Sequence, residues 1–122
     1  IAVACADCEV GIDAESMRKV RENAMRRTCT RKEWEWLQQS EQKELDFLRL
    51  WTLKESYMKM TGRGMSLPLD SFEIIRKDQG FVLGKSPKRP GFFRTMEFEN
   101  YIFSVCMESD FSLPSKGFTE LL

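Results

Sequence analysis

The stretch FLRLWTLKESYMKMTGRGM, residues 47–65, decides the fold of this chain. It predicts a helix that is apolar on nearly all sides, and such helices are usually core helices. Three charged residues nevertheless lie in its middle, namely Lys54, Glu55 and Lys59. A buried charge is costly unless it is paired or bound to a metal. This stretch therefore predicts a central core helix together with a cluster of charges that must have partners.

The composition is that of one ordinary globular domain. The chain has 122 residues, of which 31% are charged and 42% are hydrophobic, and its formal net charge is zero. This length is sufficient for one domain with one core. The zero net charge provides no general attraction to nucleic acid or to membranes, and no apolar run approaches the roughly 20 residues that span a bilayer. No signal peptide is visible, so we expect a cytoplasmic protein.

Histidine is absent from the chain, and there are four cysteines. The absence of histidine excludes Ser-His-Asp and Cys-His catalysis, together with every zinc site that needs histidine. Cys5 and Cys8 form a C-x-x-C motif. A structural zinc would need two further ligands, and only Cys29 and Cys106 remain, singly placed. We therefore expect Cys5 and Cys106 to be small buried hydrophobic residues in strands, and we expect no disulfides in a cytoplasmic protein.

Hydrophobic periodicity and turn residues predict a single α+β domain over residues 1–122. The order of elements, β-β-α-α-α-β-β-β, is typical of helices packed on an antiparallel sheet. Helices are expected at about 16–27, from residue 30 to a break near residue 40, and at about 43–61. Strands are expected at 1–6, at 10–15, on either side of a turn at 78–80, and within 98–109, with a turn at 7–9 and a loop at 86–91.

Cap residues fix the ends of two of these helices. Thr30 is a candidate N-cap, and Glu33 stands three residues later, as in a capping box. Gly62 or Gly64 can adopt the left-handed conformation that ends a helix, and Pro68 prevents the helix from restarting. These signals start one helix after Thr30 and end the long helix before the two glycines.

Two acids share one face of the strand VGIDAE, residues 10–15. Because side chains alternate along a strand, the Cβ atoms of Asp13 and Glu15 should lie about 7 Å apart, close enough for both carboxylates to reach one cation. Gly11 on the same face keeps space open for that cation. A solvent-facing acidic edge explains the strand alone at least as well, since exposed acids are common. The opposite face is expected to point into the core: Val10, Ile12 and Ala14.

Glu55 changes this balance, because it supplies a third carboxylate if the long helix packs against the strand. Three oxygen ligands with open positions suit Mg²⁺, which keeps waters and shares phosphate oxygens. Lys59 lies one helical turn from Glu55, with Trp51 on the same face and Lys54 beside it. A surface Glu-Lys pair would explain the charges but not their apolar neighbours. The residues therefore predict a Mg²⁺-dependent phosphoryl or phosphodiester reaction, and the lack of a basic-aromatic stripe makes nucleic acid the weaker substrate.

These stretches resemble the motifs of the 4'-phosphopantetheinyl transferases of the surfactin-synthetase type. The family pattern is G-[IV]-D-[IV]-E, followed by W-[ST]-x-K-E-[AS]-x-x-K and G-x-G-[LM]. The first motif departs from the pattern at Ala14, which should loosen core packing without touching the metal. The W, K, E, K and G positions of the second motif are all met within residues 51–65. TRKEWEWL, residues 30–37, also resembles the S-x-x-E-[WY]-x-x-L segment, and the resemblance covers nearly the whole chain.

The resemblance implies that the phosphopantetheine arm of coenzyme A moves to a serine of an acyl, peptidyl or aryl carrier protein, with release of adenosine 3',5'-bisphosphate. Lys59 and Lys54 would neutralise phosphate charge, with Lys59 assisting catalysis. Glu33 matches the acid that deprotonates the carrier serine, but closing the Thr30 capping box explains this residue equally well. The partner supplies the nucleophile, so this chain needs no reactive serine or cysteine. The Mg²⁺ ligands would be Asp13, Glu15 and Glu55.

The resemblance also implies that this chain needs a second part. Surfactin-type enzymes are about twice as long, with two similar halves and the active site between them, and this chain resembles the second half. It begins with Ile rather than Met, and the S-H-[ST]-G motif of the family is expected just before residue 1. We therefore expect an upstream N-terminal half or a homo-oligomer, as in the shorter, trimeric holo-acyl-carrier-protein synthases. The alternatives are an inactive half-domain for assembly or carrier-protein binding, and an unrelated metal-dependent phosphohydrolase.

Overall fold

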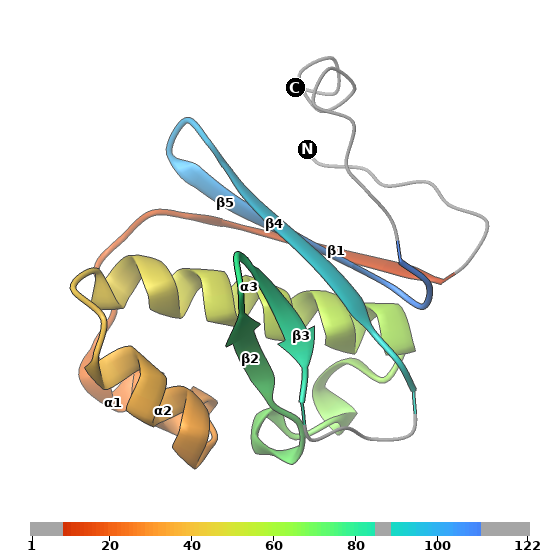
Figure 1. Cartoon of the computed structure of the whole chain (residues 1–122), viewed down its shortest axis with the longest axis horizontal. Coiled ribbons are helices and arrows are strands. Elements are labelled where there is room, and N and C mark those ends of the chain that lie inside the picture. Colours follow the sequence, from red (N-terminus) through yellow and green to blue (C-terminus); the bar gives the residue numbers. More distant parts are fainter. Residues whose placement is uncertain (1–8, 85–88, 111–122) are drawn as a thin grey trace.

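The computed structural model describes residues 9–84 and 89–110. One five-stranded antiparallel sheet, in the order β1-β5-β4-β3-β2, packs against a long central helix (Figure 1). The strands are β1 Val10–Ser16, β2 Ile74–Lys77, β3 Gly80–Leu83, β4 Phe92–Phe98 and β5 Tyr101–Met107. The helices are α1 Glu22–Thr28, α2 Arg31–Gln38 and α3 Lys43–Thr61, followed by the short 3-10 turns η1 Gly64–Ser66 and η2 Leu69–Ser71. The predicted α+β fold, with helices packed on an antiparallel sheet, is confirmed.

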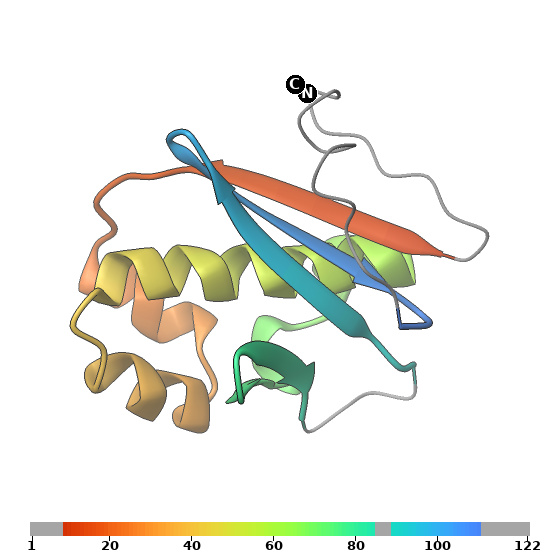
Figure 2. The ribbon, with the colours of Figure 1, turned by 45° about the horizontal axis from the view of Figure 1, so that its top comes forward.

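Helix α3 forms the core because it has neighbours on two sides. Figure 2 shows α3 between strands β1, β5 and β4 on one side and α1, α2 and the β2–β3 hairpin on the other. The predicted bounds of this helix are confirmed, and Gly62 ends it with a φ of 74°. No helix in the described part of the chain is long and apolar enough to span a membrane. The buried apolar side chains of α3 are Phe47, Leu48, Leu50, Leu53, Tyr57, Met58 and Met60.

The prediction of which face of β1 meets the core is wrong. Gly11 and Asp13 are buried and Ala14 is exposed, so the acidic face is the one turned toward α3. A Cβ atom on Gly11 would lie 2.5 Å from the backbone nitrogen of Met60 and closer still to a carbonyl oxygen of α3. Glycine therefore lets the strand and the helix touch. Alternation along a strand predicts which side chains share a face, but not which face a helix will cover. The residues expected in the core but found on the other face are Val10, Ile12 and Ala14.

The first helix starts later than predicted. A helix is expected from residue 16, but β1 continues to Ser16, which pairs with Tyr101 of β5. The next backbone amide, that of Met17, donates to the carbonyl oxygen of Asn100 at 2.8 Å. Pairing with β5 therefore keeps the chain extended, and helix α1 begins only at Glu22.

Strand β4 is not among the predicted elements, although it pairs with β5 along its whole length. The two strands are joined by Glu99 and Asn100, and Glu99 adopts a φ of 53°. Hairpins of this kind usually carry Asn-Gly or Asp-Gly at the turn, and that signature is missing here. The predicted strand at 1–6, and parts of the turn at 7–9 and of the loop at 86–91, lie outside the described residues.

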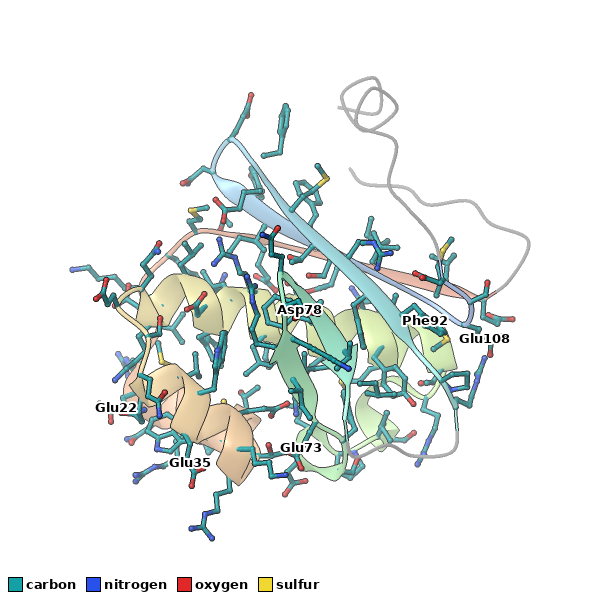
Figure 3. The ribbon with its side chains drawn as sticks, in the orientation of Figure 1. Glu22, Glu35, Glu73, Asp78, Phe92 and Glu108 are labelled. Atoms are coloured by element: carbon teal, nitrogen blue, oxygen red, sulfur yellow. The ribbon has the colours of Figure 1, made fainter. Side chains whose placement is uncertain are left out.

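Two local predictions are confirmed in detail. In the capping box of α2, the backbone amide of Thr30 donates to Glu33 Oε1 at 2.8 Å, and the Glu33 amide donates to Thr30 Oγ1 at 3.3 Å. Strands β2 and β3 form the expected hairpin, with Asp78 at its turn (Figure 3) and a φ of 54° at that residue.

Candidate active site

Strand β1 and helix α3 bring acids of the predicted metal site to one side of the sheet. Asp13 on β1 pairs with Lys59 on α3, with Nζ 2.7 Å from Oδ1. Two residues further along β1, Glu15 Oε1 accepts a hydrogen bond from the indole N–H of Trp51 at 3.2 Å. Glu55 lies between Trp51 and Lys59 on the helix and interacts electrostatically with both acids of β1. The acids predicted to act together are therefore neighbours.

The carboxylates of this cluster repel one another. Burial raises the pKa of Asp13 above its ordinary value of 3.8, although the hydrogen bond and charge of Lys59 oppose this rise. Burial also raises the pKa of Glu55, and the negative charges of Asp13 and Glu15 add to the rise, while Lys59 again opposes it. Glu15, which accepts the Trp51 N–H, also has a cationic partner in Arg18, at 2.8 Å. The cluster therefore holds negative charge at a cost that a bound cation would relieve.

One carboxylate oxygen of the cluster is available to bind a metal ion. Among the described residues, Oδ2 of Asp13 is buried without a hydrogen-bond partner, which is rare for a buried polar atom. A carboxylate oxygen is the ligand that Mg²⁺ prefers, so the donor chemistry fits. Among the described residues, no three carboxylate or thiol groups lie close enough together to form a ready metal site, so binding of one ion by Asp13, Glu15 and Glu55 stays a prediction. Lys59 and Trp51 engage Asp13 and Glu15 instead.

The structure places Glu33 and Lys54 away from this cluster, inside the protein. Their side chains are 1% and 0% exposed, and Lys54 Nζ lies 2.8 Å from Glu33 Oε1. Glu35, two residues further along α2, points outward by contrast (Figure 3). The predicted contacts of Glu33 with a carrier serine and of Lys54 with phosphate therefore need correction, because neither side chain reaches the surface.

Cys29 and Cys106, the two cysteines within the described residues, have the properties of structural thiols. Burial raises the pKa of Cys29 to about 12, and burial raises the pKa of Cys106 to about 12 as well. A thiol with so high a pKa is inert, since the thiolate is the nucleophile. Cys106 is buried in β5 as predicted, and both residues are free thiols. Cys5 and Cys8 lie outside the described residues.

The sequence argument missed the partners that hold Glu15. Trp51 is partly buried against the core and uses its indole N–H to bind Glu15. Its position one turn before Glu55 was the available signal, because a tryptophan on a charged helix face seeks an acceptor for its N–H group. Arg18, which pairs with Glu15 from the segment after β1, gave no sequence signal that we recognise.

The chain has an α+β fold in which the acids of one strand face an acid and a lysine of the core helix. Residues 9–106 match the family model of the 4'-phosphopantetheinyl transferase superfamily, and the chain belongs to that superfamily. It is 37% identical over 121 residues to a 4'-phosphopantetheinyl transferase of Bacillus subtilis, covering 93% of this chain and 54% of the relative. It is 34% identical over 101 residues to the 4'-phosphopantetheinyl transferase gsp of Aneurinibacillus migulanus, covering 80% and 43%. The chain thus spans about half the length of these relatives.

Solved structures show the same fold at lower identity. A holo-[acyl-carrier-protein] synthase of Thermotoga maritima superposes with a TM-score of 0.70 at 16% identity, covering 81% of this chain and 61% of that chain. A holo-(acyl-carrier-protein) synthase of Bacillus anthracis, solved in complex with coenzyme A (3',5'-ADP), also gives a TM-score of 0.70, at 17% identity, covering 81% and 93%. At these identities the likeness establishes the fold alone.

Proposed function

We propose that this chain carries the metal-binding part of a 4'-phosphopantetheinyl transferase, which moves the phosphopantetheine arm of coenzyme A to a serine of an acyl or peptidyl carrier protein. The observation that carries the proposal is the buried, unpartnered Oδ2 of Asp13 beside the negative charges of Glu15 and Glu55. Membership of the superfamily supports it, as does the presence of coenzyme A in the Bacillus anthracis structure of the same fold.

Asp13, Glu15 and Glu55 would hold Mg²⁺ in this proposal. When bound, Mg²⁺ would supply charge neutralisation for phosphate groups during the transfer. Lys59 would act beside these acids, because its side chain is 50% exposed and its ammonium can turn from Asp13 to a phosphate oxygen. Trp51 keeps Glu15 facing the helix through its indole N–H. Glu33 and Lys54 are given no contact with substrate, because both are enclosed.

The proposed reaction is a phosphoryl transfer to an outside nucleophile. The carrier serine oxygen forms a bond to the phosphorus that bears the pantetheine arm, while its O–H bond breaks and the proton passes to solvent. The bond from that phosphorus to the bridging oxygen breaks, and adenosine 3',5'-bisphosphate leaves with that oxygen. The chain contributes positioning and charge, which are the main requirements of phosphoryl transfer.

We propose further that an N-terminal half or a second copy of the chain completes the coenzyme A site. The chain spans about half the length of its relatives. Coenzyme A carries a pyrophosphate and a separate 3'-phosphate, and binding of the remote group helps to orient the reacting one. Lys59 can serve one of these anionic groups, and the other needs a cationic site elsewhere. We therefore expect the chain as a monomer to transfer phosphopantetheine poorly.

The test is mass spectrometry of a carrier protein incubated with coenzyme A, Mg²⁺ and the chain, alone and with a candidate partner half. The expected result is addition of the phosphopantetheine mass by the assembled form, and loss of this addition in Asp13→Ala and in Glu55→Ala. Glu44→Gln, a change at an exposed glutamate of the same helix, should have no effect. Efficient transfer by a chain shown to be monomeric would refute the need for a second part. Retained transfer in both alanine variants would refute the ligand roles.

A further inference from the structure

Lys54 is a charged residue that is fully buried and surrounded by acceptors. An ammonium group has three N–H donors, and three acceptors surround this one. They are Glu33 Oε1 at 2.8 Å, the carbonyl oxygen of Phe72 at 3.0 Å and the carbonyl oxygen of Leu69. The Phe72 ring lies below the ammonium, 4.6 Å from its centroid. Because the ammonium is enclosed among these oxygens and its side chain is 0% exposed, a phosphate oxygen does not reach it.

Glu33 completes the same network from the other side. Its Oε1 also accepts the backbone N–H of Thr30, and its Oε2 accepts the backbone N–H of Ile74, both at 2.8 Å. The pair thus joins the start of α2, the middle of α3 and the segment that runs from η2 into β2. Every one of these groups is satisfied, which is the condition under which a buried polar network specifies one arrangement.

Polar contacts with defined partners contribute to the rotation of helix α3 about its own axis, and the Lys54 network acts there together with the buried hydrogen bond between Thr52 and Ser104 at 2.7 Å. Buried apolar side chains surround this helix on nearly all sides, and hydrophobic burial is non-directional. An ion pair with defined acceptors is directional. With Lys54 directed into the interior, the next residue, Glu55, must point about 100° away around the axis, toward β1.

We propose that Glu33 and Lys54 are positioning residues, which fix the rotation of α3 and so aim Glu55 and Lys59 at the acids of β1. They act through the helix and touch no substrate. The part of this proposal that concerns transfer rests on the proposed function. The part that concerns metal binding needs only the cluster of acids.

The experiment compares Lys54→Met, Glu33→Gln and the double variant that carries both changes. Each single change leaves a buried charge without its partner, whereas the double change removes both charges. We therefore expect the thermal midpoint to fall in each single variant and to recover substantially in the double variant. Mn²⁺ binding, measured by calorimetry on the folded proteins, should nevertheless remain about tenfold or more weaker in the double variant than in the wild type, as is typical when a supporting contact of a metal site is lost.

Two further readouts separate positioning from other roles. Transfer by the assembled form should fall in parallel with Mn²⁺ affinity in the double variant, while the acidic limb of its pH profile is retained. Wild-type Mn²⁺ affinity together with lost transfer and a lost acidic limb would show that Glu33 contacts substrate, which overturns the proposal. Wild-type Mn²⁺ affinity with wild-type transfer would show a purely structural pair, which also overturns it.

Leu37→Ala is the matched control. Leu37 lies one turn after Glu33 on α2 and is fully buried, so its truncation lowers stability at the same interface without touching the ion pair. Mn²⁺ affinity should be unchanged in this variant, and a tenfold loss would attribute the effect to lowered stability and overturn the proposal. If the wild type binds Mn²⁺ but transfers nothing, the proposed function fails while the Mn²⁺ comparison still decides this inference.

Discussion

Two lysines five positions apart on α3 have opposite surroundings. Lys54 is fully buried and finds three acceptors, and its partner Glu33 is satisfied by backbone amides as well. Lys59 is 50% exposed, and its partner Asp13 leaves one buried carboxylate oxygen without a hydrogen-bond partner among the described residues. We call the network of Glu33 and Lys54 closed, because the polar groups in it have partners. We call the network of Asp13 and Lys59 open, because Asp13 Oδ2 has no hydrogen-bond partner among the described residues.

The difference separates holding the fold from performing chemistry. A closed network has no free group for a ligand. Its charges are retained because removing one partner leaves the other charge buried and uncompensated. An open network keeps unsatisfied capacity at a cost in stability, and such sites are typical of function. Both lysines match positions of one sequence motif, so the motif alone does not distinguish the two roles.

The largest expected effect is the loss of stability in Lys54→Met. This change leaves the carboxylate of Glu33 buried without its cation, and such losses amount to about 3–5 kcal/mol. Lys59→Met removes a cation that is 50% exposed from an acid that is 9% exposed, so we expect a smaller loss than in Lys54→Met, although a larger one than the about 0–1 kcal/mol of fully exposed pairs. Urea unfolding of both variants measures the free energies of unfolding directly. Equal losses in the two variants would contradict the distinction between closed and open networks.

The second-largest expected effect comes from a substitution at Gly11, which disturbs only the open network of Asp13 and Lys59. Gly11→Ala places a methyl group against backbone atoms of α3 that cannot turn aside, so β1 and α3 must separate. We expect a loss of about 3 kcal/mol, the upper end of typical overpacking costs, together with loss of Mn²⁺ binding. Gly80→Ala is the control, because the nearest atom to a Cβ there is 3.9 Å away. Retained metal binding in Gly11→Ala would show that contact between β1 and α3 is not needed for the site.

The extent to which the sequence predicts this molecule differs between its regions. The bounds of α3 and the capping box of α2 follow from local signals, because caps and apolar periodicity act over a few residues. The direction of the β1 acids does not follow, because it depends on the close approach that Gly11 permits to a distant helix. The enclosure of Glu33 and Lys54 does not follow either, since hydrogen-bond partners of both come from residues 69–74, which meet α3 only in the folded protein.

Adding Mg²⁺ should stabilise the wild type. A ligand that binds only the folded state at ten times its dissociation constant raises the free energy of unfolding by about 1.4 kcal/mol. Glu55→Gln removes one of the proposed ligands, so its stability should respond much less to the same Mg²⁺ concentration. Thermal melts with and without Mg²⁺, at constant ionic strength, provide the measurement. An equal response of both proteins would mean that any bound Mg²⁺ does not use Glu55.

The smallest effect is the pH dependence of the open network without metal. Burial and the neighbouring acids raise the pKa of Glu55 above its ordinary value of 4.5, so the folded state binds this proton more tightly than the unfolded state. As the pH rises above 4.5, the unfolded state loses the proton first, and the folded state loses stability until its own raised pKa is passed. Glu55→Gln cannot lose that proton. The variant should therefore gain stability relative to the wild type at pH 7, and the gap should close at pH 4.

Chemical unfolding of the two proteins at pH 4 and pH 7, in a metal chelator, measures this gap. Glu44→Gln serves as the control, because Glu44 is exposed on the same helix and lies outside the acidic cluster. The difference in unfolding free energy between Glu44→Gln and the wild type should therefore be the same at both pH values. Mg²⁺ at pH 7 should reverse the order of the wild type and Glu55→Gln, because a cation compensates the charge that destabilises the free site. A wild type that is as stable as Glu55→Gln at pH 7 without metal would mean that Glu55 bears no cost in the folded state, and the open network would then extend no further than Asp13 and Lys59.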